Sequence, residues 1–210
     1  MMMKKMINMF IGLVTLCLCP VAMGGEFTFE GKDASGAWYE YTGFVQPRDA
    51  SELRGIMLTW PDEIVFITIN SGGGSAFGGL DLFWEAERWD NLVTIAGKDF
   101  GAWSAAAVFW MGSPRDWFEG ENARVGFHQA YCNAWHPPGC DIQPFRDRLV
   151  EAFDRAGYFG YFFDQWLTDV QATWGVEGWA LLTDEGWRFY HSGLGISHKI
   201  IPNWEIKNEY

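Results

Sequence analysis

The chain has 210 residues, with 27 acidic and 15 basic side chains and a formal net charge of −12. Its hydrophobic content of 49% and aromatic content of 18% exclude a disordered chain, and the length suits one domain with a sizeable core. An acidic chain without a basic cluster repels the phosphates of nucleic acid, so we expect no nucleic-acid partner.

The first 24 residues have the pattern of a secretory signal peptide. Two lysines precede an apolar run over residues 6–23, and Ala22-Met23-Gly24 supplies the small-x-small pattern that signal peptidase recognises. A membrane anchor is the alternative, but the run is short for a span and is interrupted by Pro20. We therefore expect residues 1–24 to be removed, residues 25–210 to form a single domain, and the protein to be periplasmic or secreted.

Two strands and a helix are predicted at the start of the mature chain. "FTFEG" (27–31) and "WYEYTGFV" (38–45) combine aromatic and β-forming residues between glycines and prolines, which is typical of strands. Residues 49–60 have helical patterning, with Asp49 or Ser51 placed to cap the N-terminus.

The centre of the chain alternates between two patterns. Residues 63–70 are a nearly continuous apolar run, as expected of a strand buried on both faces, and residues 92–97 and 123–128 are predicted as a second and a third strand. Residues 76–90 and 102–112 lie between them and have helical spacing or alanine-rich composition. This β-α-β-α-β order predicts a parallel sheet with right-handed crossovers.

The last third of the chain is predicted to be mostly helical. Helices are expected over residues 144–157 and 159–175. A third is expected over residues 181–193, with Thr183 at its N-cap, followed by a closing strand over 194–201.

The mature chain keeps two cysteines, Cys132 and Cys140, in the stretch "CNAWHPPGC". In an oxidising compartment, two cysteines that close a short Pro-Gly loop most simply form a disulfide. The alternative is a metal site that uses Cys132, His136 and Cys140, which would need a fourth ligand. We favour the disulfide and expect no metal.

Three polar features follow three successive predicted strands. The stretch "SGGGS" (71–75) follows the first, Ser104 opens the helix after the second, and His128 ends the third. The carboxyl ends of parallel strands meet at one edge of the sheet, so the three features should lie together. A serine needs a neighbouring base, and glycines let backbone N–H groups approach an oxyanion. Each feature alone is more often a cap, a turn or a core histidine, but their joint placement favours a catalytic site.

Two segments carry a resemblance to a known family. "ITINSGGGSAFGGLDLF" (67–83) and "TIAGKDFGAWSAAAVFWMGSPRDWFEGENARVGFHQAY" (94–131) resemble the Clp-type serine protease branch of the Clp/crotonase superfamily. The likeness is greater still to exported Clp-like proteins of bacteria. It covers about residues 42–131 well and 180–201 loosely. It implies an α/β fold, a parallel-sheet superhelix of ββα units with helices packed around it.

The resemblance also implies roles for individual residues. Ser104 matches the family's nucleophile and His128, 24 positions later, its general base. The N–H groups of Gly74 and Ala105 match the oxyanion hole.

The chain departs from the family pattern at three places, one of which is the spacing from Thr183 to Gly193, about two residues longer than the family's closing helix. Gly72 replaces the usual proline of the glycine loop, and no aspartate stands at the position of the third catalytic residue. Glu177 is the nearest acid and our choice for that role, with Asp184 and Asp169 as alternatives. The third residue orients the histidine and supports its positive charge, so its identity bears directly on activity.

These observations predict an exported serine hydrolase that cleaves peptides or proteins without a cofactor. We expect a homo-oligomer, with the aromatic stretch 158–166 as a candidate interface, and no ATPase partner, because ATP is scarce outside the cytoplasm. The first alternative is a Clp-like binding or assembly module that is catalytically weak or inactive. The second is a crotonase-like enzyme acting on coenzyme A thioesters, which export disfavours.

Overall fold

The strands in the part of the chain that the structure describes form two sheets. The structure, a computed structural model, describes residues 24–120, 122–128, 141–157, 160, 164–165, 167–169, 172, 178–183 and 205–208. The strands are β1 (Glu26–Lys32), β2 (Ala37–Thr42), β3 (Val65–Asn70), β4 (Leu92–Ala96), β5 (Ala102–Trp103), β6 (Asp116–Phe118), β7 (Arg124–Phe127), β8 (Gly178–Thr183) and β9 (Glu205–Asn208). One sheet has the order β1-β2-β3-β4-β6 and the other β5-β7-β8-β9.

The five-stranded sheet is parallel except at one edge. β1 and β2 form an antiparallel hairpin, whereas β2, β3, β4 and β6 run parallel to one another. In β3 the residues Val65, Ile67 and Ile69 are fully buried and alternate with half-buried residues. All five residues of β4 are buried, as expected of a central strand covered on both faces. The parallel pairing predicted from the apolar runs is confirmed for β3 and β4, whereas the third predicted strand, residues 123–128, belongs to the second sheet as β7.

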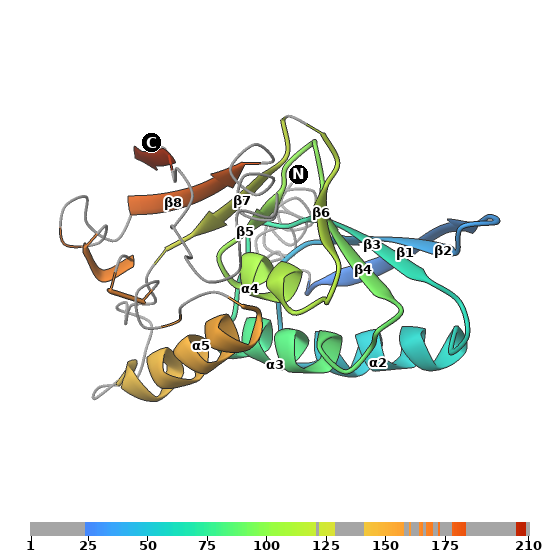
Figure 1. The fold of residues 1–210 in the computed structure, drawn as a ribbon, viewed down its shortest axis with the longest axis horizontal. Coiled ribbons are helices and arrows are strands. Elements are labelled where there is room, and N and C mark those ends of the chain that lie inside the picture. The colour runs from blue at the N-terminus through green and yellow to red at the C-terminus, as the bar shows by residue number, and fades with distance from the viewer. Residues whose placement is uncertain are drawn as a thin grey trace, which may run out of the picture.

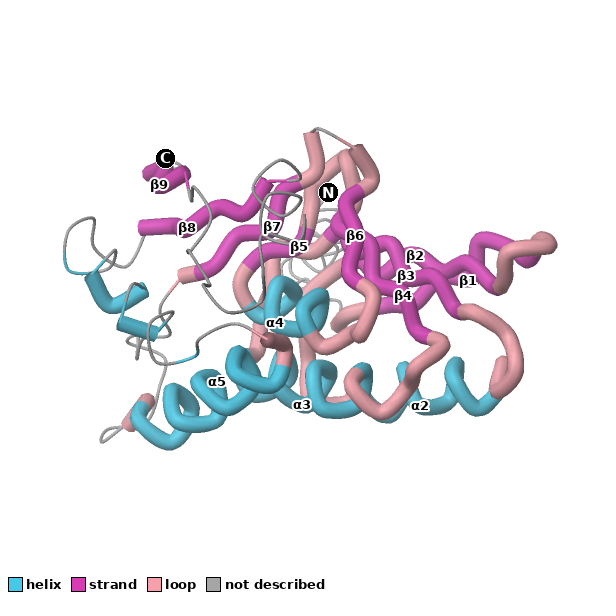
Figure 2. Tube along the Cα trace, viewed as in Figure 1, coloured by secondary structure: helices cyan, strands magenta, loops and turns pink. Residues whose placement is uncertain are grey.

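The labelled helices lie together on one side of the strands (Figures 1 and 2). They are α2 (Asp49–Thr59), α3 (Ala76–Ala86), α4 (Ala105–Met111) and α5 (Gln143–Arg155). The first two helices follow β2 and β3 and form a row with α5, while α4 lies between this row and the strands (Figure 1). The part predicted as a second C-terminal helix, 159–175, is helical at each of its residues that the structure describes.

Helices α3 and α4 approach each other closely because two glycines face the contact. A Cβ atom on Gly79 would lie 2.6 Å from the Ala105 carbonyl oxygen, and one on Gly112 would lie 2.7 Å from the Cα of Phe83. Ala105, Ala106 and Ala107 are all buried in the same core. Small residues on both helices therefore allow α4 to pack close to α3. This packing also determines the position of the serine that precedes α4.

The second sheet corrects two expectations. Residues 181–183, the start of the stretch predicted as a capped helix, belong to β8, which pairs antiparallel with β7 through Val125↔Leu182 and Phe127↔Ala180. Pairing with the open edge of β7 outweighs the local helical signal. Residues 102–103, included in the stretch predicted as helical, form β5 and pair parallel with β7, whereas the helix begins at Ala105 with Ser104 at its N-cap position, as predicted. β6 and β9 were not predicted.

The start of α2 corrects a third expectation. Neither Asp49 nor Ser51 caps this helix, since Arg48 occupies the N-cap position without a side-chain hydrogen bond. The Asp49 side chain is instead fully buried. It accepts hydrogen bonds from Tyr41 Oη at 2.8 Å and from the Gln46 backbone N–H at 2.7 Å.

Several predicted features lie outside the described residues. They are the leader over residues 1–23, Cys132, His136 and Cys140, Glu177, Asp184 and the strand over 194–201. In the described ranges, no helix is long and apolar enough to cross a membrane. The same ranges hold no group of three or more His, Cys, Asp or Glu side chains arranged to bind a metal ion.

Candidate active site

Ser104 occupies a sharp turn between β5 and α4. Its backbone angles are φ 54° and ψ −120°, and no other non-glycine residue in the described part of the chain has a positive φ. The turn is fixed to the second sheet, because the Ser104 N–H donates to the Gly126 carbonyl at 2.8 Å. An L-residue in this conformation is strained, and such strain at a strand-to-helix turn is typical of an exposed catalytic nucleophile.

The structure brings Ser104 and His128 into contact. Ser104 Oγ lies 2.7 Å from His128 Nε2, which is a hydrogen-bonding distance, and both residues are half-buried. The contact follows from the parallel pairing of β5 with β7, in which Trp103 is opposite Gly126. The two strands end at the same edge of the sheet, and each delivers one member of the pair there.

Gly126 makes room for the bulky residue before the serine. A Cβ atom at Gly126 would lie 2.2 Å from Cε3 of the Trp103 ring, so no larger residue fits. The Trp103 indole N–H donates to the Phe100 carbonyl at 2.6 Å. Trp103 is therefore fixed between β7 and the preceding turn.

The glycine loop after β3 lies directly against the serine. Gly73 has a φ of +91°, and a Cβ atom on it would lie 2.6 Å from Ser104 Cβ and 3.0 Å from the backbone nitrogen of Ala105. Only glycine combines this conformation with so close an approach. The loop backbone thereby reaches both the serine and the first residue of α4.

Two N–H groups at this place are those predicted for an oxyanion hole. The Gly73 carbonyl accepts a hydrogen bond from the Val45 N–H at 2.9 Å. In a trans peptide the next N–H, that of Gly74, points the opposite way, away from Val45. Ala105 is the first residue of α4, and N–H groups in the first turn have no acceptor within their helix.

Asn70, which sequence reasoning missed, organises the turn that leads to the serine. Its Oδ1 accepts hydrogen bonds from the N–H groups of Phe100 (3.1 Å) and Gly101 (3.3 Å), and its Nδ2 donates to Glu40 Oε1 at 2.9 Å. The available signal was its position, because a polar residue ends the apolar strand just before the glycine loop. Asn70 ties β2, β3 and this turn together.

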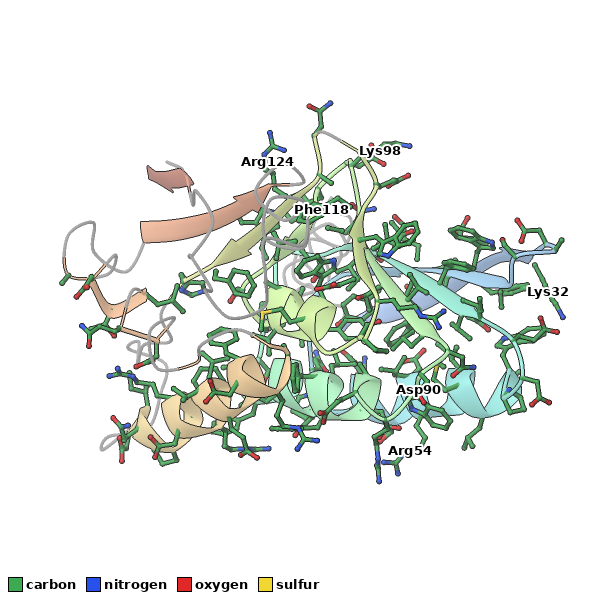
Figure 3. The ribbon with its side chains drawn as sticks, viewed as in Figure 1. Lys32, Arg54, Asp90, Lys98, Phe118 and Arg124 are labelled. Atoms are coloured by element: carbon green, nitrogen blue, oxygen red, sulfur yellow. The ribbon has the colours of Figure 1, made fainter. Side chains whose placement is uncertain are left out.

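A surface ion pair also holds that turn in place. The Lys98 ammonium lies 3.1 Å from Glu119 Oε1, and the Lys98 backbone N–H donates to Oε2 of the same carboxylate at 3.0 Å. Hydrogen bonding to Glu119 raises the pKa of Lys98 above its ordinary value. Lys98 lies on the side of the molecule opposite helices α2 and α3 (Figure 3).

The structure leaves the third catalytic residue undecided. Glu177 and the alternative Asp184 lie outside the described residues. Asp169 is described and exposed, and its carboxylate accepts a hydrogen bond from Gln165 Nε2 at 3.0 Å. The role given to Glu177 stays a prediction.

Comparison with known proteins identifies the fold. No protein-family model and no curated protein matches the sequence. Among solved structures, the chain is similar to 1510-N, a membrane-bound stomatin-specific protease in a serine-to-alanine mutant form, with a TM-score of 0.50, 10% sequence identity and coverage of 72% of this chain and 73% of that chain. It also matches a mutant of ClpP1 from Listeria monocytogenes, with a TM-score of 0.49, 15% identity and coverage of 70% and 82%.

The chain has a Clp-type protease fold. At such low identity the likeness to the stomatin-specific protease concerns the arrangement of helices and strands alone. The fold class predicted from the sequence is confirmed.

Proposed function

We propose that the chain is a serine-type peptidase in which Ser104 is the nucleophile and His128 the general base. The observation that carries this proposal is the 2.7 Å contact between Ser104 Oγ and His128 Nε2. It occurs at the single strained non-glycine turn of the described chain, within a Clp-type fold. A serine that only capped a helix would need neither the strained backbone nor the histidine, and Ser104 makes no capping hydrogen bond with its side chain.

The proposed reaction follows the usual course of acyl transfer. His128 Nε2 takes the proton from Ser104 Oγ as that oxygen attacks the carbonyl carbon of the peptide bond. The N–H groups of Gly74 and Ala105 bind the oxyanion that forms. His128 then gives its proton to the leaving amine, and an acyl-serine ester remains. Water, deprotonated by His128, attacks the ester, and the proton returns to Ser104 as the acid product leaves.

A carboxylate behind His128 would hold the ring in the correct tautomer and stabilise its positive charge. We assign this role to Glu177 on sequence grounds. Replacing Glu177 with Gln should lower kcat with little change in KM, because the carboxylate acts through the histidine rather than on the substrate. The same replacement at Asp184 and Asp169 tests the two alternatives.

We also propose that the chain is exported and forms a homo-oligomer. The amino-terminal pattern supports export, and the aromatic stretch 158–166 is the candidate interface. Amino-terminal sequencing of the protein recovered from the periplasm or medium should begin at about Gly25. Light scattering of that protein should give a mass that is a multiple of the chain mass.

Labelling with a fluorophosphonate tests the peptidase proposal directly. Purified protein with its cysteines oxidised should be labelled at Ser104, and Ser104→Ala and His128→Ala should abolish the label. Ser51→Ala is the matched control, because Ser51 is an exposed helical serine and its loss should leave labelling unchanged. Absence of any label on the folded parent protein would overturn the proposal and favour a Clp-like binding module without catalysis.

A further inference from the structure

Two exposed phenylalanines flank the glycine loop of the site. The side chains of Phe44 and Phe100 are 51% and 58% exposed. A Cβ atom built on Gly72 would lie 3.5 Å from Cε1 of Phe100, and one built on Gly74 would lie 2.9 Å from Cδ1 of Phe44. The two rings therefore lie against the first and the last of three consecutive glycines.

The glycine between them is the one that contacts the serine. A Cβ atom on Gly73 would lie 2.6 Å from Ser104 Cβ. Consecutive Cα atoms are about 3.8 Å apart, so the glycines that contact the two rings are each one residue away from the glycine that contacts the serine. The loop thus places one aromatic ring on either side of the residue nearest the nucleophile.

The backbone that carries Phe100 is held at both of its polar groups. Its N–H donates to Asn70 Oδ1 at 3.1 Å, and its carbonyl accepts from Trp103 Nε1 at 2.6 Å. Two residues earlier, Lys98 is bonded to Glu119 through its backbone and its side chain. The Phe100 ring is therefore exposed on a turn whose backbone is held in place by hydrogen bonds.

Hydrogen bonds hold the backbone around Phe44 in the same way. The Gly43 carbonyl accepts from Ser71 Oγ at 2.7 Å. The Val45 N–H donates to Gly73, and the Val45 carbonyl accepts from the N–H of Ser75, both at 2.9 Å. Phe44 is thus fixed to the glycine loop from both of its neighbours in the chain.

Other exposed phenylalanines have aromatic partners that account for their positions. Phe29 is also 51% exposed, but it stacks on Trp60 at 6.1 Å between ring centroids, and Phe77 meets Phe145 at 5.6 Å. Within the described chain, no aromatic ring packs on Phe44 or on Phe100. Half-exposed rings on a fixed backbone beside a nucleophile are suited to binding an apolar group.

We propose that Phe44 and Phe100 determine the specificity of the site. They receive aromatic or large aliphatic side chains of a peptide, one on each side of the bond presented to Ser104. As a statement about cleavage this inference rests on the proposed peptidase function, whereas the binding of such peptides can be measured without catalysis. Gly72, which replaces the family's proline, places no side chain against the edge of the Phe100 ring.

Binding to an inactive variant gives the first test. Ser104→Ala protein is titrated with two labelled peptides of equal length and charge, one with Phe-Phe and one with Ser-Ser at its centre, and fluorescence anisotropy is recorded. The Phe-Phe peptide should bind roughly tenfold or more tightly than the other. Adding Phe44→Ala or Phe100→Ala should remove most of that difference, whereas adding Phe29→Ala, an equally exposed control, should not. Equal affinities for both peptides would overturn the inference.

Cleavage by the active chain gives the second test and separates the two proposals. Phe44→Ala and Phe100→Ala should each lower kcat/KM for the Phe-Phe peptide about tenfold, with fluorophosphonate labelling of Ser104 unchanged. Normal labelling together with equal cleavage of both peptides would overturn the specificity assignment and leave the peptidase intact. No labelling, with the anisotropy difference preserved, would overturn the peptidase and leave the two rings as a peptide-binding site.

Discussion

The two ends of helix α3 are held by opposite means. Its N-terminal end follows the glycine loop beside Ser104, where Ser75 Oγ accepts from the Gly78 N–H at 3.1 Å and the contacts are backbone against backbone. Its C-terminal end carries Glu85, whose buried carboxylate accepts from Arg54, Arg88 and Trp89. The N-terminal end is held by close backbone contacts at glycines next to the strained serine turn. The C-terminal end is held by ion pairs and hydrogen bonds to the Glu85 carboxylate.

The difference shows which contacts position the site and which only hold the fold. Close approach at Gly73 and Gly79 leaves no room for a Cβ atom beside the serine turn and the start of α4. The Glu85 cluster joins α3 to α2 through long side chains that can adjust, since Arg54 on α2 is half exposed. Figure 3 shows Arg54 on the helical side of the molecule, remote from Lys98 and the turn before β5. Changes at the first end should impair activity, and changes at the second should impair stability alone.

The largest effect is expected from Ser104→Gly. It removes the proposed nucleophile, so peptide hydrolysis should fall on the order of 10⁴-fold or more. It also allows the φ of 54° without strain, so the free energy of unfolding should rise by about 1 kcal/mol. Denaturant titration and peptidase assays of the same preparation check both results.

Ser104→Ala serves as the matched variant, because alanine removes the hydroxyl but keeps the strain of a Cβ atom at positive φ. It should lose activity equally and gain no stability. If Ser104→Gly were no more stable than Ser104→Ala, the turn would not be strained. Backbone strain would then not distinguish the N-terminal end of α3 from its C-terminal end.

The next largest effect is expected from Gly79→Ala, a substitution on α3 at its contact with α4. The added Cβ atom would lie 2.6 Å from the Ala105 carbonyl oxygen and 3.0 Å from the Ala105 Cβ, so α4 must move away from α3. We expect a loss of about 2 kcal/mol in the free energy of unfolding. The shift also moves Ser104, so kcat should fall by more than any change in KM. Unaltered kcat in a destabilised variant would show that packing at Gly79 does not position the serine.

The parallel sheet and the meeting of Ser104 with His128 could be predicted because their causes are local. Apolar runs such as 65–70 and 92–96 mark strands buried on both faces, and a glycine loop or small-residue turn marks where each ends. The prediction placed both residues at the end of one sheet, whereas in the structure the short strand β5, which was not predicted, pairs parallel with β7 and brings Ser104 to His128. The catalytic roles of these residues remain predictions that the labelling experiment tests.

The features that were missed depend on partners distant in the sequence. Asp49 has the residue type and position of an N-cap, but its carboxylate accepts a hydrogen bond from Tyr41, eight residues earlier, in the protein interior. Burial and this hydrogen bond raise the pKa of Tyr41, which keeps the phenol a donor. Residues 181–183 follow the edge of β7 rather than their helical signal. The position of Asn70 at the end of an apolar strand marks it as unusual, but its hydrogen bond to a turn 30 residues away depends on the fold.

Glu85→Gln tests the charged end of α3 and should have a smaller effect. Burial opposes the charge of Glu85, but hydrogen bonds from Arg54, Trp89 and Arg88 outweigh it and hold its pKa below the ordinary value. Both arginines are more than half exposed, so we expect a loss of only about 1 kcal/mol at neutral pH, with unchanged peptidase activity.

The loss in Glu85→Gln should depend on pH in a defined direction. A carboxyl group whose pKa is lowered by folding stabilises the fold above its unfolded pKa, and this contribution disappears as the pH falls through the folded pKa. The difference between parent and variant should therefore be constant near neutrality and shrink below about pH 4.5. Urea titrations at pH 7, 5 and 3.5 measure it. A difference that grows at acid pH would contradict the assigned direction.

The smallest effect is expected from Gly55→Ala, which is the counterpart of Gly79→Ala. Both glycines are helical, but Gly55 is exposed in the middle of α2, and a Cβ atom there would meet nothing within 4 Å. Alanine is the better helix former and restricts the unfolded chain, so the free energy of unfolding should rise by about 0.5 kcal/mol while activity stays unchanged. Glycine-to-alanine substitution should thus lower the free energy of unfolding at Gly79 and raise it at Gly55. Denaturant titrations of both variants and the parent protein measure these two changes. Two shifts of equal sign would mean that helix propensity, rather than the closeness of α3 to α4, sets the response at Gly79.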